Sequence, residues 1–291
     1  KVQRMRKLGG IISDELIISK EKVEISASIC KTDLTSDLVG EFPELQGIMG
    51  GYFSLHQGFE KDISIAISEQ YLPVGLESKI PKKPFSIALS ITDKIDTLVG
   101  FFGINEKPSS SKDPFALRRV ALGIIRTLIE NKKNLKVNDL INYSLSLYRD
   151  QGYNFENQNL NKELNNFLKE RFKYYMKEKQ IRFDIIDATI FSFSINNLFS
   201  SFEKAKSLNK VINDRVGQDI LSSYKRASNI LDYEMQDNEV EISSTTDPGI
   251  FKNDFEKNLY KKTIELKKYF TEIPKNNNFD ETLVLLSSAK K

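Results

Sequence analysis

Apolar residues recur at the three- and four-residue spacing of a helix along most of the chain, and this pattern predicts an all-α protein. The helices expected from the spacing cover residues 63–70, 88–102, 117–128, 160–175, 197–213, 214–232 and 254–272. The alternation of Val240 and Ile242 is too short to predict a strand. No heptad pattern is long enough to indicate a coiled coil.

Proline, glycine and polar clusters separate these helices and predict the loops. The expected loops cover residues 72–84, 103–113 and 237–249. Asp113 followed by Pro114 is typical of a helix start, because a carboxylate can cap free amides and proline lacks the N–H that a first turn leaves unpaired. The segment 132–138 is interpreted as a joint, since a chain of 291 residues favours two domains over one.

The segment Lys31 to Tyr52, KTDLTSDLVGEFPELQGIMGGY, combines the helical period with a proline restart and three close glycines. Apolar stripes run on both sides of Pro43, which is best tolerated as the first residue of a new helical turn. Gly47, Gly50 and Gly51 lie beside the second stripe, although each glycine inside a helix costs about 1 kcal/mol. We therefore expect another backbone to approach the helix closely here.

Composition adds few constraints. Hydrophobic residues make up 40% and charged residues 29% of the chain, as in an ordinary globular protein. No apolar run of about 18 residues and no secretory signal is present, and the single cysteine, Cys30, excludes an internal disulfide, so the cytoplasm is the expected compartment. The net charge is only +3, which predicts that any contact with RNA is local.

Two further segments join Lys31–Tyr52 in a resemblance to a known family. They are SITDKIDTLVGFFGINEKPSSSKDPFALRRVALGIIRTLIE, from Ser90 to Glu130, and SYKRASNIL, from Ser223 to Leu231. The three segments together resemble the beta subunit of the bacterial tetrameric glycyl-tRNA synthetase. That subunit is longer than this chain, which resembles its C-terminal part, beginning inside the subunit and stopping short of its end.

The resemblance implies an all-α fold with two helical domains. The first is a degenerate HD-type domain over residues 1–135, and the second is a helical bundle of the anticodon-binding type over residues 136–291, truncated at its C-terminus. The implied role is to bind and position tRNA for ATP-dependent attachment of glycine by the alpha-beta assembly. ATP and Mg are then used by the alpha subunit, and no cofactor is expected in this chain. The implied partners are the tRNA for glycine and the alpha subunit. A second beta subunit is a possible further partner in the tetramer, and no contact with a membrane is expected.

An HD-type domain raises the question of a metal site. That superfamily binds metal with two histidines and two aspartates, but here the adjacent pair position reads Thr32-Asp33 and the distal aspartate position resembles Asp93. The only histidine, His56, lies in another segment. A metal that activates water needs imidazoles or carboxylates converging on one ion. We therefore expect no metal site, and expect Asp33 and Asp93 to serve packing or hydrogen bonding.

No other catalytic arrangement is expected. Cys30 and His56 could meet in space, but a lone cysteine among apolar residues is usually a packing residue. No G-x-x-x-x-G-K-[ST] phosphate loop occurs, and Gly100 and Gly103 only straddle two phenylalanines. The chain thus shows no ATP site of its own, which agrees with the alpha subunit carrying the adenylate chemistry in the resembled family.

Three arginines in the 117–128 helix are candidates for binding. Arg119 and Arg126 lie seven residues apart and share a face, whereas Arg118 points about 100° away. They could contact tRNA phosphates or a partner subunit, or they could form salt bridges at a domain junction. Both alternatives stay open from the sequence.

The segment SYKRASNIL supplies the second set of candidates. Lys225, Arg226 and Asn229 lie within a turn and a half, with Ala227, Ile230 and Leu231 as the expected buried face. The resemblance implies an anticodon-binding bundle, in which lysine and arginine contact phosphates and asparagine can contact a base edge. A solvated helix face is the alternative. The aromatic residues that could stack on bases are expected to be core instead, namely Tyr174, Tyr175, Phe191 and Phe193.

A second function remains open at this point. A degenerate HD-type domain joined to a helical bundle could also be a non-catalytic regulatory or nucleotide-sensing protein. A specific, salt-sensitive affinity for tRNA would separate the two functions. Residual phosphohydrolase activity is a third alternative, which the histidine count opposes.

Overall fold

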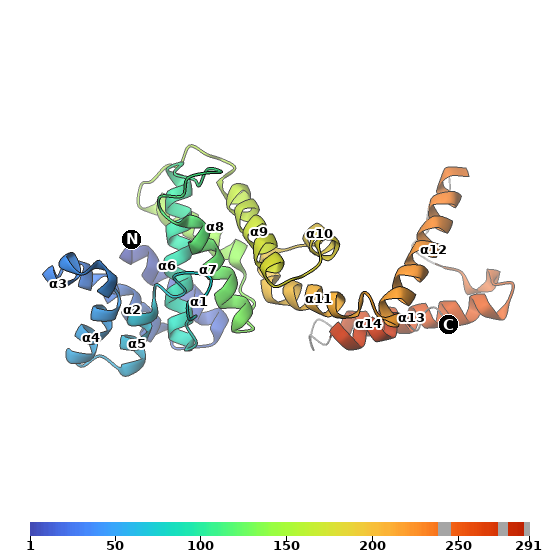
Figure 1. The fold of residues 1–291 in the computed structure, drawn as a ribbon, viewed down its shortest axis with the longest axis horizontal. Coiled ribbons are helices and arrows are strands. Elements are labelled where there is room, and N and C mark those ends of the chain that lie inside the picture. The colour runs from blue at the N-terminus through green and yellow to red at the C-terminus, as the bar shows by residue number, and fades with distance from the viewer. Residues whose placement is uncertain (238–245, 273–278, 288–291) are drawn as a thin grey trace. The chain divides into compact units, whose positions relative to one another are not determined.

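The computed structural model describes residues 1–237, 246–272 and 279–287, and within these ranges it contains helices and no strand (Figure 1). The prediction of an all-α protein is confirmed for this part of the chain. Most of the loop expected over 237–249, including Val240 and Ile242, lies outside the described residues. The part that is described ends in a short 3-10 turn, Pro248–Ile250.

The chain divides into two compact units. The first comprises Lys1–Gln180 and Ile190–Phe199, and the second comprises Ile181–Thr189 and the described residues from Ser200 onward. The domain boundary expected at residue 135 falls inside the first unit, between its seventh and eighth helices. That boundary concerns the family's domains and stays a prediction.

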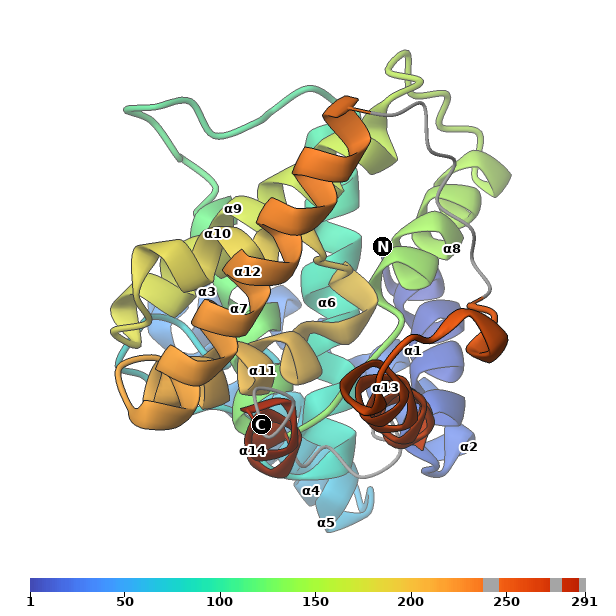
Figure 2. The same ribbon diagram turned by 90° about the vertical axis from the view of Figure 1, so that its right-hand side faces the viewer.

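Nine α-helices build the first unit. Their bounds are α1 Val2–Leu16, α2 Lys20–Ile29, α3 Asp37–Glu41, α4 Ile48–His56, α5 Lys61–Glu69, α6 Pro84–Gly103, α7 Leu117–Glu130, α8 Val137–Asp150 and α9 Leu160–Glu178. The helix α6 is central and packs against α1, α2, α5, α7, α8 and α9 (Figure 2). Because helices pack on all sides of α6, almost every residue from Ser86 to Val99 is buried, including polar ones.

The Lys31–Tyr52 segment folds as two 3-10 turns and two helices. Pro43 is the first residue of the 3-10 turn Pro43–Leu45, as its position in the sequence predicted. A β-carbon on Gly51 would lie 2.8 Å from the carbonyl oxygen of Ser64 and 2.8 Å from Cβ of Ser68. The expected close approach of a second backbone is therefore confirmed, and that backbone belongs to α5.

The apolar stripes of this segment are largely exposed. Five of their large side chains and the two that follow Tyr52 are between 37% and 66% accessible, and we call these seven the 34–55 apolar surface: Leu34, Leu38, Phe42, Ile48, Tyr52, Phe53 and Leu55. The core beneath the segment comes from other helices, with Met5, Ala27, Ile67 and Leu89 fully buried. Helical spacing thus located the helices here but not their buried face.

Two boundaries differ from the sequence prediction. The helix expected to start at Pro114 begins three residues later, at Leu117, yet the carboxylate of Asp113 still accepts hydrogen bonds from the amides of Leu117 (2.8 Å) and Arg118 (3.0 Å). The joint expected over 132–138 gives way at Val137 to α8, which the sequence analysis did not predict.

The second unit contains most of α10 (Phe183–Phe191) together with α11 (Leu198–Val211), α12 (Arg215–Asp237), α13 (Asp254–Glu272) and α14 (Phe279–Ser287). Helix α14 packs on α12 and α13. The helices expected over 197–213, 214–232 and 254–272 are confirmed. Within the described residues, no helix has both the length and the hydropathy to cross a bilayer.

Candidate functional site

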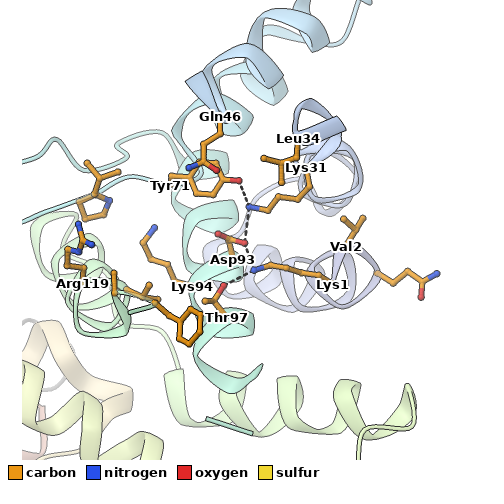
Figure 3. Close-up of a pocket in the computed structure, with 16 residues that line it drawn as sticks. Lys1, Val2, Lys31, Leu34, Gln46, Tyr71, Asp93, Lys94, Thr97 and Arg119 are labelled. Atoms are coloured by element: carbon orange, nitrogen blue, oxygen red, sulfur yellow. Dashed lines mark hydrogen bonds and ion pairs between the residues drawn. The ribbon is translucent and has the colours of Figure 1, made fainter. Parts of the chain in front are cut away.

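A cavity of about 860 Å³ opens beside α6 in the first unit. It is bounded by the start of α1, the segment after α2, the loop before α6 and the start of α7. Four basic side chains line it, Lys1, Lys31, Lys94 and Arg119, against a single acidic one, Asp93 (Figure 3). The apolar part of the wall includes Leu34, Val74 and Phe115.

Two ammonium groups share one carboxylate oxygen in this cavity. Lys1 Nζ and Lys31 Nζ each lie 3.0 Å from Asp93 Oδ1, and both side chains reach toward it in Figure 3. Lys31 also donates to the Tyr71 hydroxyl at 3.0 Å, and Lys1 to Thr97 Oγ1 at 2.7 Å. Burial alone would raise the pKa of Asp93, but the positive charges of Lys1 and Lys31 outweigh it and hold that pKa below its ordinary value.

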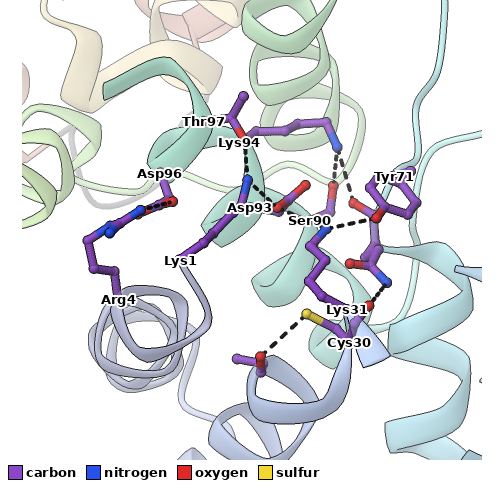
Figure 4. A network of polar contacts seen from close by, with 12 residues as sticks. Lys1, Arg4, Cys30, Lys31, Tyr71, Ser90, Asp93, Lys94, Asp96 and Thr97 are labelled. Atoms are coloured by element: carbon purple, nitrogen blue, oxygen red, sulfur yellow. Dashed lines mark hydrogen bonds and ion pairs between the residues drawn. The ribbon is translucent and has the colours of Figure 1, made fainter. Parts of the chain in front are cut away.

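Lys94 follows Asp93 on α6 and is buried, at 5% accessibility. Its Nζ donates to the Leu72 carbonyl at 2.7 Å and to Ser90 Oγ at 2.8 Å, so its hydrogen bonds stay within the wall (Figure 4). Burial lowers the pKa of Lys94 to about 7, although the nearby Asp93 acts in the opposite direction. The cavity thus combines the ammonium groups of Lys1 and Lys31 with a third amino group, that of Lys94, which is about half protonated near pH 7.

The Asp33 carboxylate binds backbone amides, whereas that of Asp93 binds lysine side chains. Asp33 Oδ2 accepts hydrogen bonds from the amides of Gly47 (2.5 Å) and Gly50 (3.2 Å), at the start of α4. Gly47 has φ of +79°, and a β-carbon on Gly50 would lie 3.1 Å from the Asp33 carboxyl carbon, so the glycines bring the amides to the carboxylate. Asp33 is therefore a helix cap, which explains both this aspartate and the glycine set that follows it.

A metal ion does not fit these residues. The Asp33 carboxylate is directed at backbone amides, and the Asp93 oxygen that a cation would need is held by two ammonium groups. No group of three or more His, Cys, Asp and Glu side chains in the described ranges is placed to hold a metal. The excess of positive charge suits an anion instead.

The candidate nucleophile Cys30 and the candidate base His56 lie in different environments, one buried and one exposed. Cys30 is buried, its thiol donates to the Ala27 carbonyl, and burial raises its pKa to about 12, so it is not a thiolate at neutral pH. His56 is exposed at the last position of α4. These properties agree with the packing role expected of Cys30.

The three arginines of α7 have three environments. Arg126 is buried and its guanidinium donates to the carbonyls of Gly75 (2.5 Å) and Ser78 (3.0 Å) and to Glu130 (2.8 Å). Arg118 is half-buried and donates to the Ser109 carbonyl. Arg119 is exposed, and no described side chain or carbonyl accepts a hydrogen bond from it. The RNA contact expected of Arg126 stays a prediction, but its donors are already engaged within the chain.

The candidates on α12 are accessible in the second unit. Lys225, Arg226 and Asn229 are all exposed. The face expected to be buried is not, since Ile230 is 65% and Leu231 is 45% accessible and Ala227 is exposed as well. That prediction was wrong because helical spacing shows which residues share a face, but not whether another helix covers it.

The aromatic residues expected in the core have mixed outcomes. Tyr175 is buried at 2% accessibility, and Phe193 stacks on the buried Phe172 with ring centroids 4.9 Å apart. Phe191, at the end of α10, is 95% exposed, so its assignment to the core was wrong. Tyr174 is 36% exposed on α9 and is only partly covered.

Sequence reasoning missed the buried ion pair that joins α1, α6 and α8. The Arg4 guanidinium binds Asp96 through Nε (2.8 Å) and Nη2 (3.2 Å) (Figure 4). It also lies 3.6 Å from the centroid of the Tyr148 ring. The Tyr148 hydroxyl donates to the Asp96 carbonyl at 3.0 Å. The available signal was the polar pair Asp93 and Asp96 inside an otherwise apolar helix, where charged residues need partners.

Comparison with known proteins shows which sequences this chain resembles. The family model described as glycyl-tRNA synthetase beta subunit matches residues 1–191. The glycine–tRNA ligase beta subunit of Rickettsia canadensis (strain McKiel) is 39% identical over 265 residues, which cover 91% of this chain and 38% of the relative. The protein of the same name from Rickettsia felis is 36% identical over 289 residues, covering 99% of this chain and 40% of the relative.

The chain therefore spans about two fifths of the length of the curated relatives that it matches. The family model covers more than half of the chain, and the similarity extends over both units. The chain belongs to the glycyl-tRNA synthetase beta subunit family.

Proposed function

We propose that this chain binds and positions tRNA for the ATP-dependent attachment of glycine by an assembly of alpha and beta subunits. The observation that carries the proposal is the similarity of nine tenths of the chain to proteins named glycine–tRNA ligase beta subunit. In this proposal, the alpha subunit uses ATP and Mg. The partners are that subunit, the tRNA for glycine and a second beta subunit, in the cytoplasm.

The proposal includes the identity of the two domains. Residues 1–135 form a degenerate HD-type domain, and residues from 136 onward form a bundle of the anticodon-binding type. The capping role of Asp33 and the two ammonium groups on Asp93 support the degenerate character, because both aspartates serve contacts within the chain. The first domain then contributes a binding surface and no hydrolysis.

Co-purification with a glycyl-tRNA synthetase alpha subunit, followed by aminoacylation, tests the function. We expect the full-length beta subunit to restore glycylation that the alpha subunit alone lacks. We expect this chain alone to show no glycine-dependent pyrophosphate exchange. Exchange by the isolated chain would contradict the assignment of adenylate chemistry to the alpha subunit.

The exposed face of α12 is the proposed RNA contact of the second unit. Replacing Lys225 and Arg226 by alanine in the full-length subunit removes two positive charges, so tRNA binding should weaken and the log-log salt dependence should flatten by about 1.5 to 2. Folding should change by only a few tenths of a kcal/mol, because both side chains are exposed. Asn229→Ala should instead alter discrimination among tRNAs.

A matched loss of charge on α13 controls for net charge. Lys261 and Lys267 are exposed, so Lys261→Ala with Lys267→Ala removes the same charge from another helix. Equal effects of the two double variants on affinity and salt dependence would remove the α12 face from the RNA site. The alternative function, a regulatory or nucleotide-sensing protein, predicts no specific, salt-sensitive tRNA affinity in any of these proteins.

A further inference from the structure

A second, smaller cavity of about 350 Å³ lies between α7, α9 and the loop at residues 73–76. Four arginines line it, three from α7 and one, Arg171, from α9. No aspartate or glutamate is part of its wall among the described residues. Such a concentration of guanidinium groups without acidic neighbours in the wall is typical of a site for an anion.

The arginines divide into structural and unpaired ones. Arg126 holds the carbonyls of Gly75 and Ser78 and so fixes the loop that forms one wall. Arg118 is tied to the Ser109 carbonyl at the rim. Arg119 and Arg171, in contrast, have no hydrogen-bond acceptor among the described residues.

Arg171 is the most informative of the four. Its Nε is buried and has no hydrogen-bond partner, although buried donors in proteins are nearly always paired. The guanidinium carbon lies 5.7 Å from the centroid of the Tyr174 ring, so an aromatic side chain flanks it on its own helix. A half-buried guanidinium beside aromatic rings that lacks an acceptor within the described residues can take one from outside the chain.

We propose that Arg119 and Arg171 together bind a phosphodiester group of RNA, with Tyr174 beside the neighbouring ribose or base. Guanidinium groups bind phosphate through paired N–H donors, and aromatic rings stack on bases of any sequence. Arg119 and Pro73 line both this cavity and the 860 Å³ cavity described above, so these two cavities adjoin. Two adjoining cation-lined cavities fit a polymer with repeated phosphates better than they fit one free nucleotide.

This inference rests on the tRNA-binding role proposed above and adds residues to it. The test uses the full-length beta subunit with its alpha subunit and a tRNA titration at several salt concentrations. We expect Arg171→Gln to weaken binding about tenfold and to lower the salt slope by roughly 0.7 to 0.9, the loss of one phosphate contact. Arg171→Lys, which keeps the charge but not the paired donors, should be intermediate.

Lys173→Gln is the matched control. Lys173 lies two residues further along α9, about 200° around the helix, and pairs with Glu170 at 3.1 Å. The thermal midpoint of Arg171→Gln should stay close to that of the wild type, because the change removes no hydrogen bond within the described residues and only ring contacts at 5.7 Å and 6.0 Å. If that variant unfolds, the exposed Arg119→Gln provides the same test.

Failure of this inference can be told from failure of the proposed function. If the wild type binds tRNA and Arg171→Gln and Arg119→Gln both match the Lys173→Gln control, the inference is overturned and the proposed function stands. If the wild type binds no tRNA, both are overturned. If inorganic phosphate or AMP, at constant ionic strength, stabilises the wild type but not Arg171→Gln while tRNA binding is unchanged, the ligand is a free phosphate and the RNA assignment is overturned.

Discussion

Replacing Lys94 by methionine tests the electrostatics of the cavity. The ammonium group is buried in α6 and hydrogen-bonded to the Leu72 carbonyl and Ser90 Oγ, and its pKa in the folded chain is about 7 instead of 10.5. Methionine has a similar length and no charge, so it removes the titration with little change in packed volume. The quantity of interest is the free energy of unfolding as a function of pH.

The direction of the effect follows from proton binding. Between pH 7 and 10.5 the unfolded chain carries a proton on Lys94 that the folded chain has released, so the free energy of unfolding rises with pH across this window. The full difference between the two pKa values corresponds to about 5 kcal/mol at 1.36 kcal/mol per pH unit. Between pH 7.5 and 9.5 this gives the wild type a gain of about 2 to 3 kcal/mol that the variant lacks.

Urea denaturation of both proteins at half-unit steps of pH measures the difference directly. Titrating groups remote from Lys94 are common to both proteins and cancel, whereas Asp93, Lys31 and Lys1 interact with Lys94 electrostatically. Lost hydrogen bonds shift the variant's curve by a constant amount. Lys162→Met, at an exposed position of α9, is the control and should run parallel to the wild type. A difference between wild type and Lys94→Met that stays constant within 0.5 kcal/mol from pH 7.5 to 9.5 would refute the reasoning.

Three further substitutions test packing and capping, each by urea denaturation at pH 8. Asp33→Ala should destabilise the chain by about 2 to 4 kcal/mol, because two buried helix-start amides lose their acceptor; a cost under 0.5 kcal/mol would disprove the cap. Gly51→Ala should cost about 1 to 3 kcal/mol through contact with the α5 backbone, whereas Gly40→Ala, which meets open space, should be neutral or stabilising; equal effects would contradict the packing. Asp96→Ala should lower the free energy of unfolding by about 3 to 5 kcal/mol, because the buried Arg4 guanidinium loses its carboxylate. Asp62→Ala, which removes a side chain that is 48% accessible, should cost less than about 1 kcal/mol, and similar losses for the two variants would count against a buried pair.

The helices with a strong apolar period could be predicted from the sequence, as could the role of Pro43. Helix α8 could also have been found, because Leu140, Ile141, Leu145 and Tyr148 repeat at helical spacing and are buried. These helices can be predicted from the local sequence because the apolar residues of an amphipathic helix recur every three to four positions.

The candidate site was less predictable, because its contacts join distant segments. Lys1 reaches Asp93 from the start of α1 and Lys31 from the segment after α2, and no local pattern relates them. The exposure of Ile230 depends likewise on what packs against α12. The missing histidines led us to expect no metal at Asp33 and Asp93, and that stays a prediction. The amides that bind Asp33 and the lysines that bind Asp93 emerge only in three dimensions.

The 34–55 apolar surface has a consequence for how the protein behaves in solution. Seven large apolar side chains lie exposed within 22 residues on a chain whose net charge is only +3, so little electrostatic repulsion opposes contact between molecules. Sulfate and similar salts strengthen the burial of apolar groups. The purified chain should therefore self-associate as its concentration rises and precipitate early in an ammonium sulfate series, and Tyr52→Lys or Leu55→Lys should improve its solubility without changing its fold.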